Sequence, residues 1–175
     1  SKAFHDVVYR NWSGALVADH ATAIEQLRAR HSFLSDDKVG VMGDSWGGNS
    51  AFRLCAERPD IYAAAVCAGP GFDPYSSMLY EPYLGLPQDD TGPYEAASCV
   101  AHANQQQAEL MIVSGTADFF SWSDAMKLSE QLIRVGHQHE FVVLPGQQHA
   151  YDSVHDEYFG RKYAAFFRQH LQGAR

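Results

Sequence analysis

Gly43-Asp44-Ser45-Trp46-Gly47-Gly48 follows a short apolar run, Val39-Gly40-Val41-Met42, and precedes a segment with helical character from about Asn49 to Arg58. A serine with a glycine two residues before it and another two residues after it, between a strand and a helix, is the pattern of a nucleophile elbow. The turn is so tight that side chains at the two glycine positions would collide. Ser45 is therefore predicted to expose its hydroxyl at the carboxyl edge of a sheet. A plain Gly/Ser turn is the competing interpretation of this motif alone.

Two later loops supply the partners that a serine nucleophile needs, a base and a carboxylate that orients the base. Leu110–Ser114 has the pattern of a strand, and Asp118 lies in the turn after it. Glu140–Leu144 is another such strand, and the loop after it ends at His149. The order Ser, Asp, His, each after a strand, is that of α/β-hydrolases. We interpret Ser45 as the nucleophile, His149 as general base and acid, and Asp118 as the orienting carboxylate.

Helical and strand patterns alternate along the chain, which predicts a doubly wound, mostly parallel sheet. Residues 69–101 contain five prolines and no clean period, so this stretch is predicted to be irregular. The predicted strands are Val39–Met42, Tyr62–Ala68, Leu110–Ser114 and Glu140–Leu144, and the predicted helices are Ala15–Arg30, Asn49–Arg58, Ser123–Val135 and Val154–Leu171.

Composition and charge limit the classes of function. The 175 residues are 46% hydrophobic, which predicts one folded domain over residues 1–175. A net charge of −8 argues against nucleic acid and anionic membrane as partners, because both require a basic surface. No apolar run approaches the roughly 20 residues of a membrane span, and the first six residues do not resemble a signal peptide. Three cysteines in apolar surroundings are predicted to be buried free thiols, which favours a reducing, cytoplasmic compartment.

The chain resembles the C-terminal part of the catalytic domain of serine peptidases of the prolyl oligopeptidase family (S9). The resemblance implies an α/β-hydrolase fold, the triad Ser45, Asp118 and His149, no metal or organic cofactor, and a peptide or small acyl substrate. It also implies the backbone N–H of Trp46 as a donor of the oxyanion hole. Trp46 and Tyr83 are implied as walls of the substrate pocket, with core packing as the alternative for both rings. The matching motifs are Gly43–Gly48, Tyr83–Pro87, Gly115–Asp118 and Pro145–His149, and the match covers essentially the whole chain.

The chain departs from the family pattern in three places. The family's catalytic domain begins with further strands, which carry the second oxyanion donor and follow a β-propeller. The resemblance therefore implies a domain incomplete at its N-terminus, whose exposed sheet edge a second copy or the missing segment would cover. Phe119-Phe120-Ser121-Trp122 stands where the peptidases have polar residues and a valine, which predicts a more apolar cleft. Ser114 stands where the family often has histidine.

Other polar clusters have weaker claims to chemistry. His137 and His139 could lie on one strand face, but no neighbouring cysteine or carboxylate completes a set of metal ligands, so exposed turn histidines are predicted. Asp152 is a rival orienting carboxylate for His149, although its place near the start of the last helix favours a role in stabilising that helix. Asp89–Asp90 is predicted to be solvated turn charge.

The sequence thus predicts a serine peptidase that cleaves short peptides through an acyl-enzyme intermediate. A carboxylesterase or a dienelactone-hydrolase-like acyl hydrolase is the alternative within the enzyme class, because the elbow and the triad order are shared across the fold. An inactive hydrolase module that needs a partner chain is the non-catalytic alternative.

Overall fold

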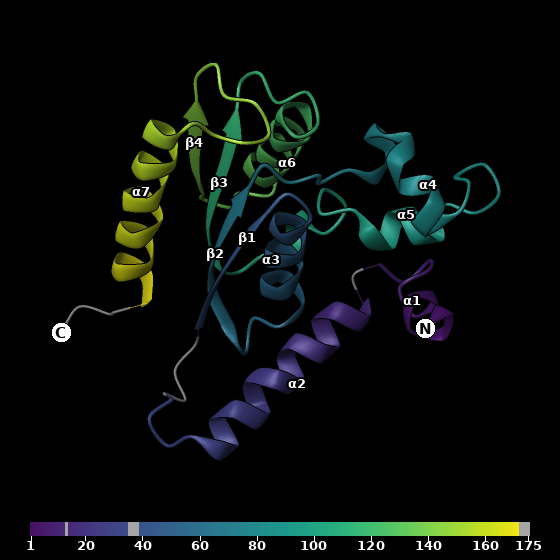
Figure 1. The fold of residues 1–175 in the computed structure, drawn as a ribbon, viewed down its shortest axis with the longest axis horizontal. Coiled ribbons are helices and arrows are strands. Elements are labelled where there is room, and N and C mark those ends of the chain that lie inside the picture. The colour runs from purple at the N-terminus through teal and green to yellow at the C-terminus, as the bar shows by residue number, and fades with distance from the viewer. Residues whose placement is uncertain (13, 35–38, 172–175) are drawn as a thin grey trace.

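The protein is a layered α/β fold in a computed structural model that describes residues 1–12, 14–34 and 39–171 (Figure 1). Its centre is a four-stranded parallel sheet in the order β1-β2-β3-β4. The strands are β1 (Val39–Asp44), β2 (Tyr62–Ala68), β3 (Glu109–Gly115) and β4 (Glu140–Leu144). The α-helices are α1 (Lys2–Asp6), α2 (Gly14–Arg30), α3 (Trp46–Glu57), α4 (Glu81–Leu84), α5 (Gly92–Ala97), α6 (Trp122–Arg134) and α7 (Ser153–Leu171), and the 3-10 turns are η1 (Pro74–Ser76), η2 (Met78–Tyr80) and η3 (Ala103–Gln105).

The predicted strands and long helices are all present, and the doubly wound parallel sheet is confirmed. The boundaries differ most at the elbow. Strand β1 continues to Asp44, and helix α3 begins at Trp46 rather than near Asn49. A single residue, Ser45, therefore separates strand from helix. The apolar run and the helical pattern could not reveal this, because Gly47 and Gly48 carry no hydrophobic signal.

The prediction that residues 69–101 are irregular is wrong in part. The segment contains η1, η2, α4 and α5, each between 3 and 6 residues long. Elements this short complete fewer than two turns and give no readable period. Helix α1 was not predicted for the same reason, since it has only 5 residues.

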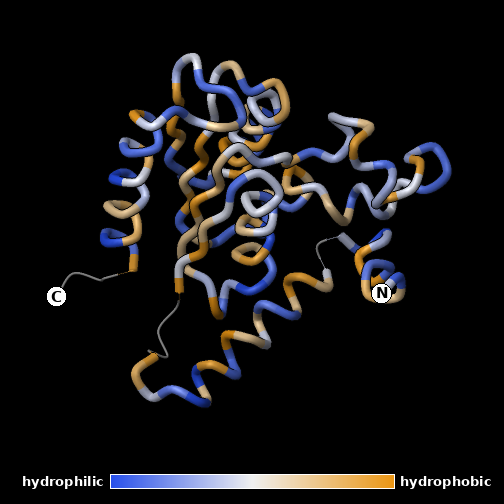
Figure 2. Tube along the Cα trace, viewed as in Figure 1, coloured by the Kyte–Doolittle hydropathy of each residue, from blue (hydrophilic) through white to orange (hydrophobic). Residues whose placement is uncertain are grey.

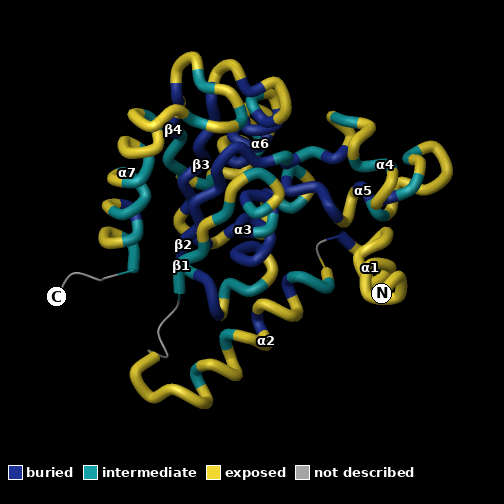
Figure 3. Tube along the Cα trace, viewed as in Figure 1, coloured by how far each residue is buried: buried dark blue, intermediate teal, exposed yellow. Residues whose placement is uncertain are grey.

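Helices cover both faces of the sheet, so its central strands are buried on both sides and read as continuous apolar runs. On one face, Cys67 and Ile112 join residues of α2, α3 and α6 in the larger core cluster. On the other face, Val66 and Val113 pack with residues of β4 and α7. Figure 2 colours much of β2 and β3 as hydrophobic, and Figure 3 shows the same strands as buried.

A third, smaller cluster lies beside the sheet and joins the N-terminal segment to the β2–β3 connection. Trp12 packs there with Tyr94 and Leu84. The Arg10 N–H donates to the Tyr83 carbonyl at 2.7 Å, and the Arg10 guanidinium pairs with Asp90. Figure 1 accordingly shows α1 next to α4 and α5. This cluster positions the aromatic side chains that line the site described below.

Three further expectations bear on the surroundings of the fold. Cys55, Cys67 and Cys99 are buried and unpaired, as predicted. Strand β1 is an edge strand of the described sheet, and its Met42 is 49% exposed. No helix in the described ranges has the length and apolar character to cross a membrane.

Candidate active site

Ser45 sits in the strained turn that the elbow motif predicts. Its φ of 55° and ψ of −119° are a backbone conformation that non-glycine residues rarely adopt. Two acceptors hold its N–H, the Ala68 carbonyl at 2.8 Å and the Asp44 carboxylate at 2.9 Å. The Asp44 side chain thus stabilises the turn. The neighbouring strand β2 and the side chain of Asp44 together stabilise the conformation that presents the Ser45 hydroxyl.

The glycine requirement falls on different positions from those predicted. A Cβ at Gly43 would overlap the backbone carbonyl of Gly47. A Cβ at Gly48 would come within 2.8 Å of Pro70, whereas a Cβ at Gly47 would meet no atom within 4 Å. The prediction that Gly47 must lack a side chain is therefore wrong. Steric need lies at Gly43, where strand and helix cross, and at Gly48, where the helix passes β2.

The structure brings Ser45, His149 and Asp118 together from three loops. His149 Nε2 lies 2.8 Å from Ser45 Oγ, and His149 Nδ1 lies 2.8 Å from Asp118 Oδ2. An ionised carboxylate can only accept, so Nδ1 must carry the ring proton towards Asp118. Nε2 is then the acceptor for the Ser45 hydroxyl. This is the tautomer that general-base chemistry at Ser45 requires.

Asp118 is 1% exposed, yet its carboxylate has four donors. The N–H groups of Phe120 and Ser121 donate to Oδ1 at 3.0 and 3.2 Å. The Ser121 hydroxyl donates to Oδ2 at 2.5 Å, beside the bond from His149. Burial raises the pKa of Asp118, but the hydrogen bonds from Ser121 and His149 outweigh burial, and the pKa lies below its ordinary value. Asp118 is therefore held as an anion.

Sequence reasoning missed Ser121. The available signal was local: a serine three residues after a carboxylate, at the start of a helical pattern, is the arrangement of a cap. Ser121 is the N-cap residue of α6, but its hydroxyl turns back to Asp118.

The loops of Asp118 and His149 are hydrogen-bonded to each other, which fixes their separation. The Ala117 N–H donates to the Gln147 carbonyl at 2.9 Å, and the Gly146 N–H donates to the Thr116 hydroxyl at 2.8 Å. A Cβ at Gly115 would overlap the Gln147 carbonyl, so glycine is needed where the two loops cross. These bonds position the carboxylate and the imidazole before any substrate binds.

Asp152 does not compete with Asp118 for His149. Its Oδ1 accepts from the N–H groups of Val154 and His155, and from the His155 ring. The hydrogen bonds from His155 lower the pKa of Asp152 to about 2. The predicted place at the start of the last helix is confirmed, since α7 begins at the next residue.

An open cavity of about 480 Å³ lies in front of Ser45 and His149. Its walls are mainly aromatic. Trp46 and Tyr83, the predicted pocket residues, both line it, and their rings also contact each other. Trp12 was not predicted, although it stacks on Trp46 and meets Tyr83 edge to face. The other large side chains on the wall are Leu79, Tyr80 and Phe120.

Trp46 also contributes its backbone. It begins helix α3, and the N–H groups in the first turn of a helix have no acceptor within the helix. The Trp46 N–H is therefore available beside the Ser45 hydroxyl, at the end of a helix dipole that favours negative charge. This is the property that an oxyanion donor needs.

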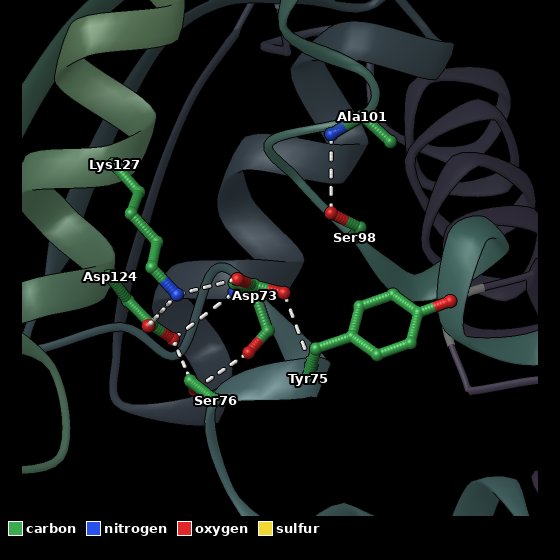
Figure 4. A network of polar contacts seen from close by, with 7 residues as sticks. All are labelled: Asp73, Tyr75, Ser76, Ser98, Ala101, Asp124 and Lys127. Atoms are coloured by element: carbon green, nitrogen blue, oxygen red, sulfur yellow. Dashed lines mark hydrogen bonds and ion pairs between the residues drawn. The ribbon is translucent and has the colours of Figure 1, made fainter. Parts of the chain in front are cut away.

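A buried carboxylate anchors the wall formed by η1. Asp124 on α6 accepts from the Asp73 N–H at 3.1 Å and from the Ser76 hydroxyl at 2.9 Å (Figure 4). Lys127, one turn along α6, pairs with Asp73 at 2.7 Å. Ser76 and Ser77 both line the cavity. Burial raises the pKa of Asp124, and the hydrogen bonds from Asp73 and Ser76 only partly offset this rise.

The two clustered histidines are structural. His137 Nε2 lies 3.1 Å from the Ala108 carbonyl, and His139 Nε2 lies 2.8 Å from the Ser129 hydroxyl. Both rings are half-buried, so the prediction of exposed turn histidines is wrong. Each ring finds its partner on another element, which spacing along the sequence cannot show. Within the described ranges no group of three His, Cys, Asp or Glu side chains is placed to hold a metal ion.

The fold and the assembled side chains agree with a comparison to known proteins. The model of the prolyl oligopeptidase family matches residues 1–174. The chain belongs to the prolyl oligopeptidase family.

Relatives within the family are distant, and some lack activity. The chain is similar to dipeptidyl peptidase 8 of Homo sapiens, with 24% identity over 77% of this chain and 16% of that protein. It is also similar to inactive dipeptidyl peptidase 10 of Rattus norvegicus, with 22% identity over 94% of this chain and 21% of that protein. The chain thus spans about a fifth of the length of these relatives. Because one relative is inactive, family membership does not decide activity.

Solved structures of family members share the fold. A putative dipeptidyl aminopeptidase IV from Bacteroides ovatus superposes with a TM-score of 0.92 and 20% identity, over 97% of this chain and 24% of that chain. The α/β-hydrolase fold of the prolyl oligopeptidase family is therefore shared by nearly the whole chain.

The elbow predicts contrasting effects of alanine at its two flanking glycines. Gly43→Ala is expected to lower the free energy of unfolding by about 1–3 kcal/mol, because the new Cβ must displace the Gly47 carbonyl. Gly47→Ala is the matched control: its Cβ meets no neighbour, and alanine favours the helix by up to about 1 kcal/mol. Urea unfolding followed by circular dichroism measures both. Equal losses in the two variants would contradict the steric account.

Asp124 predicts a pH-dependent difference in stability. A carboxyl whose pKa is raised by folding stabilises the protein below its ordinary pKa and loses that contribution as the pH rises through the folded value. Asp124→Asn cannot titrate and therefore escapes this loss. The stability of the variant relative to wild type should rise as the pH rises above the ordinary pKa of an aspartate and through the raised pKa of Asp124. Urea unfolding at several pH values tests this, and a difference that stays constant or falls would contradict it.

Proposed function

We propose that the protein is a serine hydrolase that cleaves amide bonds of short peptides through an acyl-enzyme. The observation that carries the proposal is the continuous pair of 2.8 Å contacts from Ser45 through His149 to Asp118. A serine and a histidine without a chemical role would need neither these contacts nor the strained backbone of Ser45. The Ser45 backbone is held by Ala68 and Asp44, the His149 ring by Asp118, and the Asp118 carboxylate by donors of residues 120 and 121.

In the first half of the reaction, the Ser45 oxygen attacks the substrate carbonyl while His149 Nε2 takes the hydroxyl proton. Asp118 stabilises the imidazolium that forms and keeps the ring in its orientation. The carbonyl oxygen becomes an oxyanion, to which the Trp46 N–H donates. His149 then gives its proton to the leaving amine, the C–N bond breaks, and an ester to Ser45 remains.

In the second half, water replaces the amine. His149 Nε2 takes a proton from the water, whose oxygen attacks the ester carbonyl. The second tetrahedral intermediate collapses when His149 protonates the Ser45 oxygen. The acid product leaves and the free enzyme is restored. Each step needs only acid–base groups that the described residues supply.

The cavity favours an uncharged, apolar acyl group. Trp12, Trp46, Tyr80, Tyr83 and Phe120 surround the space in front of Ser45. Burial of apolar surface against such walls contributes roughly 25 cal/mol per Å². This lining also suits a small ester, so a carboxylesterase or dienelactone-hydrolase-like acyl hydrolase is the second candidate. Phe120 lines the cavity and its ring contacts that of the exposed Phe119, and this apolar wall favours this candidate over a strictly peptide substrate.

Covalent labelling with a fluorophosphonate probe tests the proposal. The wild-type protein is expected to gain one adduct by intact mass, and peptide mapping should locate it on Ser45. Ser45→Ala should gain none, because it lacks the attacking oxygen. His149→Ala should react at least about a hundredfold more slowly, because the general base is lost.

Ser50→Ala is the matched control, since the Ser50 hydroxyl donates to the Trp46 carbonyl within α3 and is not part of the triad. Its labelling rate should equal that of wild type. A folded wild-type protein that gains no adduct would contradict the proposal and favour an inactive module. Rates on aminoacyl amides against matching esters then separate the two enzyme candidates.

A further inference from the structure

Two serine hydroxyls form a chain behind Asp118, on the side away from the cavity. Ser121 Oγ lies 2.5 Å from Asp118 Oδ2, and Ser114 Oγ lies 3.2 Å from Ser121 Oγ. Both serines are fully buried, with 0% of their surface exposed. Ser114 belongs to β3 and Ser121 caps α6, so the chain joins the strand and the helix that enclose the Asp118 turn.

The direction of the two hydrogen bonds follows from the number of protons. Asp118 is an anion and can only accept, so the single Ser121 proton must point to Oδ2. Ser121 Oγ is then an acceptor for its other neighbour, and Ser114 must donate. The order of donation is therefore Ser114 to Ser121 to Asp118. Each donation polarises the next hydroxyl, which strengthens the bond to the carboxylate.

Oδ2 also accepts the hydrogen bond from the Nδ1–H group of His149. The backbone N–H groups of Phe120 and Ser121 hold only Oδ1. A half-turn of the carboxylate about its Cβ–Cγ bond would exchange its two oxygens. The backbone N–H groups could then donate to either oxygen equally well. The Ser121 hydroxyl donates to the second oxygen, Oδ2, so it fixes the rotation of the carboxylate plane.

Ser114 and Ser121 both lie where the sequence departs from the family pattern. The two departures are in contact in space although seven residues separate them in the sequence. A single buried hydroxyl would need only one hydrogen-bond partner. Here both serines belong to one chain of hydrogen bonds that ends at the Asp118 carboxylate.

We propose that Ser121, supported by Ser114, is a positioning residue that holds the Asp118 carboxylate in the orientation its partner His149 needs. This inference rests on the proposed function, in which Asp118 orients the general base. The hydrogen bond from Ser121 also draws electron density from Oδ2, which lowers the negative potential that Asp118 exerts on the His149 imidazole. Three other titratable groups interact electrostatically with this part of the site. They are Asp44 at the end of β1, Asp156 in α7 and the buried hydroxyl of Tyr151 in the loop before α7.

The test compares Ser121→Ala with Ser121→Thr, Ser114→Ala and a matched control, Ser129→Ala. Ser129 is another buried serine of α6, but its hydroxyl contacts His139 rather than the site. The rate of fluorophosphonate labelling at Ser45 is expected to fall about tenfold in Ser121→Ala and about two- to threefold in Ser114→Ala. Ser121→Thr should recover most of the rate, and Ser129→Ala should match wild type.

The pH profile separates positioning from general loss of structure. Without the Ser121 donor, more negative charge remains on Oδ2, which favours the protonated imidazole. The acidic limb of the labelling profile should therefore move to higher pH in Ser121→Ala and stay in place in Ser129→Ala. Equal rates and profiles in Ser121→Ala and wild type would overturn the inference while leaving the proposed function intact.

A second readout does not depend on activity. Carbon NMR of the Asp118 carboxyl reports its titration directly in the folded protein. Loss of the Ser121 hydrogen bond should raise the pKa of Asp118 in Ser121→Ala and leave it unchanged in Ser129→Ala. If wild type did not label, the proposed function would fail, and this titration would still decide the hydrogen-bond chain. An unchanged Asp118 titration in Ser121→Ala would overturn it.

Discussion

Hydrogen bonding between the parallel strands aligns Asp44 with Ala68, Ala68 with Val113, and Gly115 with Leu144. The carboxyl ends of all four strands therefore reach one edge of the sheet at nearly the same level. Every loop that carries proposed chemistry leaves from this edge. Ser45 follows β1 directly, and its N–H bonds to the end of β2. A shift of one residue in any pairing would separate the nucleophile from its base and turn each core side chain to the other face.

The support around the site is distributed over elements that carry no proposed chemistry themselves. A backbone hydrogen bond joins the Asp118 and His149 loops. The Asp124 carboxylate holds η1 in place by accepting hydrogen bonds from Asp73 and Ser76. Trp12 comes from the N-terminal segment and completes a cavity whose other lining residues follow all four strands of the sheet. The cavity therefore depends on packing between segments far apart in the sequence.

The sequence could predict that Ser45, Asp118 and His149 meet because each has a local signature: a glycine-flanked serine, or a polar residue at the end of an apolar run. The same reasoning located all four strands and the cap of the last helix. It could not find Ser121 as a partner of Asp118, Trp12 in the cavity, or the partners of His137 and His139. Those contacts arise from tertiary packing and leave no period in the sequence. The glycine requirement was misplaced at Gly47, because the pattern gives spacing but not which backbone atoms approach.

The hydrogen bond between His149 and Asp118 sets the tautomer of the base, and the proposed chemistry depends on it. Proton NMR of the folded wild-type protein should show a strongly downfield imidazole N–H resonance from His149 Nδ1. This resonance is expected to disappear in Asp118→Ala and in His149→Ala while both variants remain folded. A folded wild-type protein without such a resonance, or a resonance that persists in Asp118→Ala, would contradict the central claim.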